Sequence, residues 1–187
     1  SSIIGLTINN QNGSGIRITE SPNIKYCIIN NFDPSWSFAI SVDGDSPNIW
    51  NCNISNAFIG ISVDQLGSTP SINNCIIYKN WAGVRNWTYS NGNETQQNIF
   101  YSLLFENNND IYDGGSNVSN DFIFSYCLFE DANFNNPNEY DFSLQSNSPC
   151  INMGNPDLDG DGQNYSIDPD DRDPDGSRLD IGALFYN

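Results

Sequence analysis

Aspartate residues recur at every second position near the C-terminus, in a run that begins at Asp157 and reads Asp-Leu-Asp-Gly-Asp-Gly. Counted from Asp157, acids occupy positions 1, 3, 5 and 12 and glycine occupies position 6. This is the spacing by which an EF-hand-type loop wraps oxygen ligands around Ca²⁺. Because Pro156 and Pro169 bracket the run, we expect a loop without flanking helices. The predicted Ca²⁺ ligands are Asp157, Asp159, Asp161, Gln163 and Asp168, and further ligands could come from Asp170, Asp171, Asp173 or Asp175.

The net charge of this segment also favours a bound cation. Residues 157–180 contain nine Asp against Arg172 and Arg178, a net charge of −7, which is self-repelling unless a cation neutralises it. Position 12 is Asp168, whose short side chain reaches an ion less easily than the usual Glu, so we expect a site of about 10⁻⁴ M. Its expected role is structural, holding the C-terminal segment over the last repeat. The alternative is an acidic turn that only water solvates.

A second group of carboxylates lies in the first half of the chain. Asp43 and Asp64 align on adjacent repeats, with Asp45 two residues further on. They could lie about 5 Å apart, a separation compatible with the paired acids of a glycosidase, so the three are candidate catalytic residues. The chain has no His, which excludes His-based catalysis. The favoured alternative is a turn cluster that is solvated or holds a cation.

Aromatic residues offer a third kind of chemistry. Trp50 follows a repeated Ile at a position that alternation predicts to point outward, and Trp87 and Tyr89 lie on a turn-rich insertion. Exposed rings on a flat strand ladder can stack on sugar faces. Trp50, Trp87 and Tyr89 are therefore the predicted carbohydrate-binding residues. The alternative is that such rings fill corners between the repeats.

Charge and hydropathy set several partners aside. The net charge is −17 with only six Lys and Arg, so the basic surface that nucleic acid or anionic lipid requires is absent from the sequence. The chain has no run of 18 apolar residues, so we expect no membrane insertion. An extracellular polysaccharide remains as the expected partner.

A sequence repeat positions the candidate acids and aromatic residues of the first part of the chain. Ser-Pro-Asn-Ile-Lys-Tyr-Cys-Ile-Ile-Asn-Asn at 21–31 returns with variations at 46–56 and 69–80, and more loosely at 99–107 and 124–131. The equivalent positions are Leu6, Cys27, Cys52, Cys75, Ser102 and Cys127. They are 21, 25, 23, 27 and 25 residues apart, a period typical of a solenoid. The Leu-x-x-Leu-x-Leu frame of a leucine-rich repeat is missing.

The repeat carries strand patterns and no helical spacing. In Ile16 to Ile18, Ile40 to Val42 and Ile61 to Val63, apolar and polar residues alternate, as in a half-buried strand. Together with the cysteine stretch, which we expect to be a strand, each coil has at least two strands. Pro22, Pro47 and Pro70 precede that stretch, as proline does at strand starts. Like residues then stack at about 4.8 Å from coil to coil.

This pattern resembles the right-handed parallel β-helix repeat proteins along the whole chain. The predicted fold is an all-β, right-handed parallel β-helix (a β-solenoid) of five to six coils over residues 1–135, with an Asp-rich capping segment over 136–187. That segment, with Tyr140-Asp141-Phe142, Ser148-Pro149-Cys150 and Asp180-Ile181-Gly182-Ala183, resembles the closing segment of bacterial surface β-helix proteins. The resemblance implies an extracellular or cell-surface location and further domains in a longer chain.

The expected function is therefore a structural or carbohydrate-contacting module with calcium in its C-terminal loop. The alternative is a β-helix polysaccharide lyase or glycoside hydrolase, and ice binding is set aside because the threonines form no ladder. The five cysteines are expected to be free, because stacked positions hold their Cβ atoms near 4.8 Å, beyond the roughly 3.5 to 4.5 Å of a disulfide.

Overall fold

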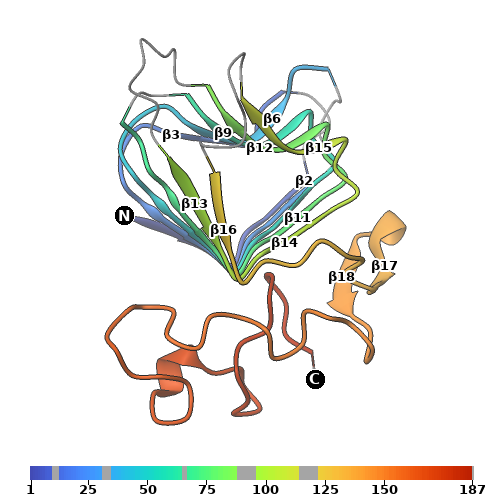
Figure 1. The fold of residues 1–187 in the computed structure, drawn as a ribbon. Helices are drawn as coiled ribbons and strands as arrows, with labels where there is room; N and C mark the ends of the chain where they lie inside the picture. Colours follow the sequence, from blue (N-terminus) through green and yellow to red (C-terminus); the bar gives the residue numbers. More distant parts are fainter. Residues whose placement is uncertain (10–12, 31–34, 65–66, 88–95, 114–121, 187) are drawn as a thin grey trace.

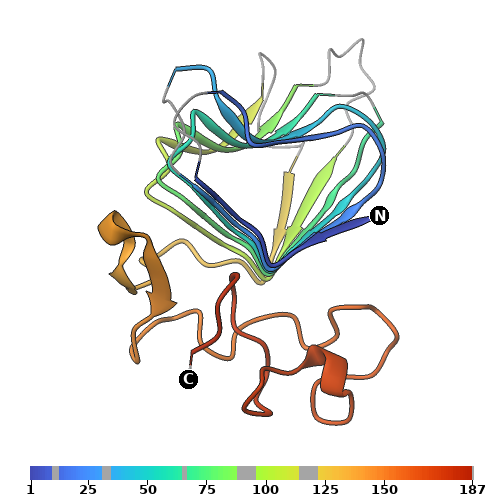
Figure 2. The ribbon, with the colours of Figure 1, turned by 180° about the vertical axis from the view of Figure 1, so that it is seen from behind.

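The computed structural model describes residues 1–9, 13–30, 35–64, 67–87, 96–113 and 122–186. This part of the chain is an all-β parallel solenoid of about four turns without α-helices. Figures 1 and 2 view it nearly along its axis, so that the coils lie behind one another. None of its helical segments has the length and apolar character needed to cross a membrane.

Three parallel sheets form the walls of the solenoid. The first contains β1 (Ser2–Ile4), β4 (Asn23–Lys25), β7 (Asn48–Trp50), β10 (Ser71–Asn73), β13 (Gln97–Phe100) and β16 (Phe122–Ser125), in that order. The second contains β2 (Thr7–Asn9), β5 (Ile28–Asn30), β8 (Asn53–Ser55), β11 (Ile76–Tyr78) and β14 (Leu103–Phe105). The third contains β3 (Ile16–Ile18), β6 (Phe38–Val42), β9 (Ile59–Val63), β12 (Ala82–Asn86) and β15 (Asn109–Asp113).

The number of turns is smaller than the predicted five to six. Sheets two and three have five strands each and so span four stacking steps. The last predicted repeat, 122–131, contributes β16 and an isolated bridge between Leu128 and Leu103, but no strand to the third sheet within the described residues. The chain leaves the coil there and enters the C-terminal segment.

Stacking in register explains the repeat. Ile24, Ile49, Ile72 and Ile99 pair in sequence across the first sheet and are fully buried. Ile29, Ile54, Ile77 and Leu104 do the same in the second sheet. Because side chains alternate between the faces of a strand, each short strand points one or two of these residues inward. The predicted strand starts are confirmed: β4, β7 and β10 each begin directly after the repeated proline.

The cysteine stretch is predicted to be one strand, but the structure divides it into two. A residue in the left-handed region divides it in every coil, with φ between 44° and 59° at Tyr26, Asn51, Asn74, Tyr101 and Tyr126. The chain turns there from the first sheet to the second, so a complete coil has three strands. Cys27, Cys52 and Cys75 follow this turn, are fully buried and are free. Cys127 and Cys150 are also free.

The C-terminal segment lies beside the solenoid (Figures 1 and 2). It does not cover the last coil, which is where the sequence analysis places it. It contains the antiparallel pair β17 (Phe134–Asn136) and β18 (Asp141–Leu144) and the 3-10 helices η2 (Pro137–Glu139) and η3 (Pro169–Asp171). Phe134, Phe142 and Ile181 pack against Ile76 and Leu103 in a second hydrophobic core. Strands of the second sheet supply these last two residues, so the segment covers that sheet from outside. We call residues 132–186 the tail.

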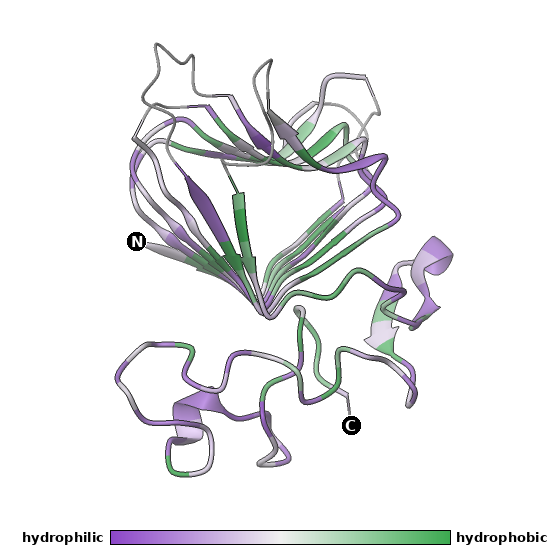
Figure 3. Cartoon of the chain, viewed as in Figure 1, coloured by the Kyte–Doolittle hydropathy of each residue, from purple (hydrophilic) through white to green (hydrophobic). Residues whose placement is uncertain are grey.

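Backbone N–H groups of the tail donate three hydrogen bonds to Asn53 and Asn74 of the coils. The backbone N–H of Asn155 donates to Asn74 Oδ1 at 2.6 Å, and that of Gly182 donates to the Asn74 carbonyl at 2.8 Å. The N–H of Ala183 donates to Asn53 Oδ1 at 3.0 Å. Gly182 has φ of 112°, and a Cβ there would lie 2.6 Å from Asn53 Oδ1, so only glycine suits this close approach. Hydrophilic residues make up much of the tail, with hydrophobic stretches between them, and the coil strands carry hydrophobic residues among polar ones (Figure 3).

Candidate functional site

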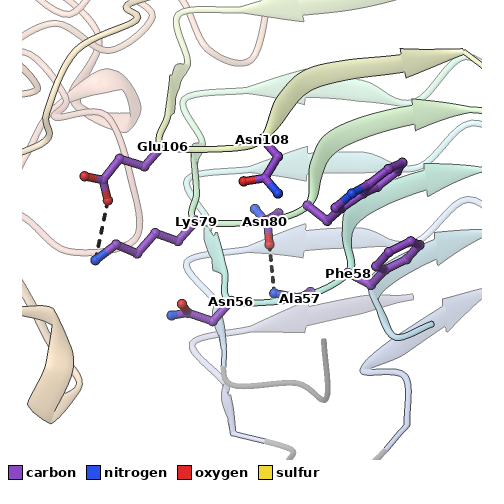
Figure 4. A pocket seen from close by; sticks show the side chains of 8 residues that line it. Asn56, Ala57, Phe58, Lys79, Asn80, Glu106 and Asn108 are labelled. Carbon is purple, nitrogen blue, oxygen red and sulfur yellow. Dashed lines mark hydrogen bonds and ion pairs between the residues drawn. The ribbon is translucent and has the colours of Figure 1, made fainter. Parts of the chain in front are cut away.

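An open groove lies at the corner between the second and third sheets. Three successive coils pass this corner without insertions, because Tyr78 pairs with Ser55 and Phe105 on one side and Ala82 with Ile59 and Asn109 on the other. Like positions therefore stack. The groove has a volume of about 540 Å³ and is lined by Asn56, Ala57, Phe58, Lys79, Asn80, Trp81, Glu106 and Asn108. Figure 4 shows seven of these residues with labels.

Aromatic rings form a ladder along one side of this groove. Phe58 and Trp81 stack with centroids 4.6 Å apart and planes 10° apart. The Trp36 ring continues the ladder at one end, with its centroid 5.3 Å from that of Phe58. The Tyr112 ring continues it at the other end, with its centroid 5.1 Å from that of Trp81. The spacing follows from the distance between neighbouring strands. Phe58 and Trp81 are half-buried, whereas Trp36 is 76% exposed, so the ladder presents ring edges along its length and an open ring at its end.

The ladder also borders a smaller hollow of about 150 Å³. Its walls are Trp36, Phe58, Ile59, Trp81, Arg85, Trp87 and Tyr112. The Arg85 guanidinium lies 5.0 Å from the Trp87 ring centroid and 4.7 Å from that of Phe38. Phe58 and Trp81 line both the groove and the hollow, so apolar ring surface and polar groups meet along one corner of the solenoid.

Polar side chains form the other side of the groove. Lys79 Nζ and Glu106 Oε2 are 3.4 Å apart, and Asn56 occupies the same position one coil earlier. Asn80 is structural, because its Oδ1 accepts from the Ala57 N–H at 3.0 Å and its amide donates to the Ile54 carbonyl at 3.3 Å (Figure 4 shows the first bond). The groove therefore offers one cation, one anion and two amides beside the aromatic rings.

The predicted carbohydrate-binding residues are not brought together. Trp50 points outward from β7, where Lys25 Nζ lies 4.2 Å from its ring centroid and its Nε1 donates to Ser71 Oγ at 3.1 Å. Trp87 follows β12 on another sheet and lines the small hollow. Tyr89 lies outside the described residues. Phe58 and Trp81 were not among the predicted residues, although their equivalent positions 23 residues apart were a usable signal.

Asp43 and Asp64 do meet on adjacent coils, as the alignment predicted. The Ser41 hydroxyl lies 2.7 Å from Asp43 Oδ1 and 3.3 Å from Asp64 Oδ2, and joins the two carboxylates. Arg17 pairs with Asp43, and Arg85 Nη2 lies 2.6 Å from Asp64 Oδ1. Each carboxylate is thus engaged by an arginine and a serine hydroxyl, whereas the two acids of a glycosidase flank the scissile bond of the sugar. This arrangement suits an ion-pair ladder that joins four coils.

Asp45 does not join this ladder. It is exposed, and its backbone carbonyl accepts a hydrogen bond from the Ser68 hydroxyl. The three candidate catalytic acids are thus a bridged pair and a separate surface residue. The described geometry favours this arrangement over a pair of acids that lie on opposite sides of a glycosidic bond.

The acidic loop of the tail brings most of the predicted metal ligands together. Its carboxylate oxygens form two groups, each within 4.8 Å: Asp157, Asp159 and Asp171 in one, and Asp159, Asp161 and Asp168 in the other. Asp157 accepts from the N–H groups of Gly160 and Gly162 at 3.0 and 3.1 Å, which curls the loop around it. Acidic clusters near the C-terminus could therefore hold a metal ion.

Gln163 donates its side-chain amide to Asp161 Oδ2 at 2.6 Å, and its role as a calcium ligand stays a prediction. Asp171, in η3, is the one of the four further candidate acids that joins a group. It is fully buried; its Oδ1 accepts from the Leu158 N–H at 2.7 Å, while its Oδ2 has no hydrogen-bond partner among the described residues. Burial raises the pKa of Asp171, and the charges of Asp159, Asp168 and Asp157 raise it further.

The donor set suits a hard divalent cation. Both groups consist of carboxylates, and Ca²⁺ takes carboxylate, carbonyl and water oxygens in flexible geometry. A buried carboxylate oxygen without a partner is costly, and a bound cation would remove that cost. The loop lies near β4, where burial lowers the pKa of Lys25 while the charges of Asp159 and Asp170 oppose that shift.

A buried pair of acids closes the tail on itself. Asp180 is almost fully buried; its Oδ1 accepts from the Asn152 N–H at 2.7 Å and its Oδ2 from the Tyr186 N–H at 2.6 Å. The Asp180 N–H in turn donates to Asp173 Oδ2 at 3.1 Å. Burial, together with the charge of Asp180, raises the pKa of Asp173 to about 8. The pair thus favours a protonated Asp173 at neutral pH.

Comparisons with known proteins give no relative. No protein-family model, no curated protein and no solved structure matches this chain. The function has to be inferred from the residues themselves.

Proposed function

We propose that this chain is a carbohydrate-contacting module that binds an extracellular polysaccharide along the groove at the corner of the second and third sheets. The observation that carries the proposal is the stacked pair Phe58 and Trp81, half-exposed and lining an open groove with Lys79 and Glu106. Aromatic rings supply apolar contact to sugar C–H groups, while a few polar groups orient the hydroxyls.

The direction of the groove suits a polymer. Its lining residues come from three coils, stacked along the solenoid axis at about 4.8 Å. An extended chain that follows the axis would meet an equivalent contact on each coil. Trp36, the most exposed ring of the ladder, would contact the chain at one end.

Loss of the central ring tests the proposal. In Trp81→Ala we expect binding to weaken about two- to tenfold, since an aromatic contact contributes about 0.5–1.5 kcal/mol and about 1.4 kcal/mol is tenfold. Retention and calorimetry would use a panel of neutral and acidic polysaccharides. Trp50→Ala is the matched control, because it removes the same side chain from another sheet.

The outcome separates the candidate functions. Weakening by Trp50→Ala but not by Trp81→Ala would move the site to the first sheet, and no retention of any polysaccharide would contradict binding. Weaker polysaccharide binding in Trp87→Ala would show that the small hollow takes part in binding. Unsaturated or reducing products in the same incubations would favour the polysaccharide lyase or hydrolase instead.

We further propose that Ca²⁺ binds the acidic loop and stabilises the tail. Its ligands would come from Asp157, Asp159, Asp161, Asp168, Asp171 and the predicted Gln163, and its contribution is charge neutralisation and cross-linking of the loop. The buried, unpartnered Asp171 Oδ2 supports this. Calcium sites of extracellular modules are weak, about 10⁻⁴–10⁻³ M, in keeping with a secreted or cell-surface location. We also propose a right-handed coil, the rule for crossovers between parallel strands.

A further inference from the structure

We propose that the acidic loop holds two cations that share Asp159, rather than one. This inference rests on the proposed calcium binding and goes further by giving the number of ions and their ligands. The first site consists of Asp157, Asp159 and Asp171, and the second of Asp159, Asp161 and Asp168.

The distances favour two ions. Ca²⁺ lies 2.3–2.6 Å from its ligands, so two ligand atoms of one ion can be at most about 5.2 Å apart. Each group of three carboxylates meets this limit, with its oxygens within 4.8 Å of one another. The five acids do not form one such group. Asp159 belongs to both, and its two carboxylate oxygens allow it to bridge two ions.

The two sites differ in burial. Asp171 is fully buried and its Oδ2 lacks a partner, and Asp157 is half-buried. In the second site, Asp161 is exposed and Asp168 is half-buried, while the exposed Asp159 is common to both sites. Carboxylates removed from water gain more from a cation than exposed ones do. The first site should therefore fill at lower calcium concentration than the second.

Charge and chain geometry agree with this order. The five acids carry five negative charges, which one divalent cation leaves largely uncompensated and two nearly neutralise. The first site also joins two stretches of the tail, because Asp171 in η3 already accepts from the Leu158 N–H. An ion there ties the start of the loop to the helix that follows it.

The test is a calcium titration of chelator-stripped protein by calorimetry, with elemental analysis after dialysis against calcium. Two equivalents per chain are expected, one tighter than the other. Asp171→Asn should remove the tighter equivalent only, because Asn can still accept from the Leu158 N–H. Asp168→Asn should remove the weaker equivalent only, and Asp159→Asn should weaken both. Asp157→Asn is a second probe of the tighter site should Asp171→Asn disturb folding, which circular dichroism would reveal.

Asp175→Asn is the matched control. Asp175 is an exposed acid of the same tail outside both groups, so this variant should still bind two equivalents. A single equivalent that Asp171→Asn and Asp168→Asn weaken alike would overturn the two-ion arrangement while leaving calcium binding intact. No bound calcium in the unmodified protein would overturn the proposed calcium role itself, and the two-ion arrangement with it.

Discussion

The coils and the tail are built by different means. In the coils, short strands pair in an unbroken register, and stacked Ile residues such as Ile49 and Ile72 are fully buried. In the tail, two short strands pair, and much of the remainder is turns held by aspartate and asparagine side chains, such as Asp161 accepting from the Gln163 N–H at 2.7 Å. Repetition specifies the coils, whereas single polar contacts specify the tail.

The two regions meet on the outer face of the second sheet. Ile76, Tyr78 and Leu103 point outward there and are buried because Phe134, Phe142 and other tail residues cover them. A sheet that is apolar on both of its faces is typical of sheets that are covered on both faces. The coils thus offer the tail a docking surface, and the tail should be the less stable of the two regions.

The largest effect is expected from the coil core. Ile54→Ala removes a fully buried side chain from β8, and a large-to-small change of this kind costs about 2–5 kcal/mol. Chemical denaturation measures the free energy of unfolding. Ile167→Ala is the tail counterpart, because Ile167 is 67% exposed, and it should change stability by less than about 0.5 kcal/mol. Comparable losses in both variants would contradict the difference between the regions.

Removal of calcium should have the next largest effect and act on the tail. At a calcium concentration 100 times the dissociation constant, one ion stabilises the folded protein by about 2.7 kcal/mol. For a chain of this size each kcal/mol shifts the melting temperature by about 2–4 °C, so EGTA should lower it by roughly 5–10 °C. An unchanged midpoint, with no calcium found by elemental analysis, would disprove the metal site.

The coils could be predicted from the sequence because each of their signals is local or repeated. Alternation at Ile61 and Val63 marked a strand, and Pro47 marked a strand start. The left-handed turn at positions such as Tyr26 was missed because a tyrosine there carries no signal that glycine would have given. The repeats gave the register of Asp43 and Asp64 but not their arginine partners.

The sequence predicted only those parts of the sites whose residues are close together in the chain. The run from Asp157 to Asp161 revealed the acidic loop, but Asp171 joins it only through the fold of the tail. The groove was missed, although Phe58 and Trp81 occupy equivalent positions, because both lie in a corner between the strands on which the repeat alignment was based. Docking of the tail depends on contacts 81 and 130 residues apart, at Asn74 and Asn53, and such pairs leave no pattern in a single sequence.

Loss of one contact between the regions should have a smaller effect. Asn74→Gly keeps the left-handed backbone, at φ 55°, but removes the acceptor of the Asn155 N–H. An unpaired, partly buried donor costs about 1–3 kcal/mol, and the lower end is expected because Asn155 is half-buried. Asn152→Gly, the control, has a similar left-handed backbone, at φ 57°, and an exposed side chain. If both variants lose equal stability by denaturation, Asn74 does not anchor the tail.

The last prediction concerns thiol reactivity and involves almost no change in stability. Burial raises the pKa of Cys150 in the tail to about 12 and also raises that of Cys52 in the coil core. Because only the thiolate reacts, both should label slowly in the native protein, and the half-buried Cys127 faster. Undocking of the tail, by EGTA or in Asn74→Gly, should expose Cys150 to alkylation while Cys52 stays protected inside the stacked coils. Mass spectrometry of labelled peptides measures the two rates separately. If Cys52 and Cys150 gain reactivity together, the coils and the tail open as one cooperative unit, and the distinction between them does not extend to their stability.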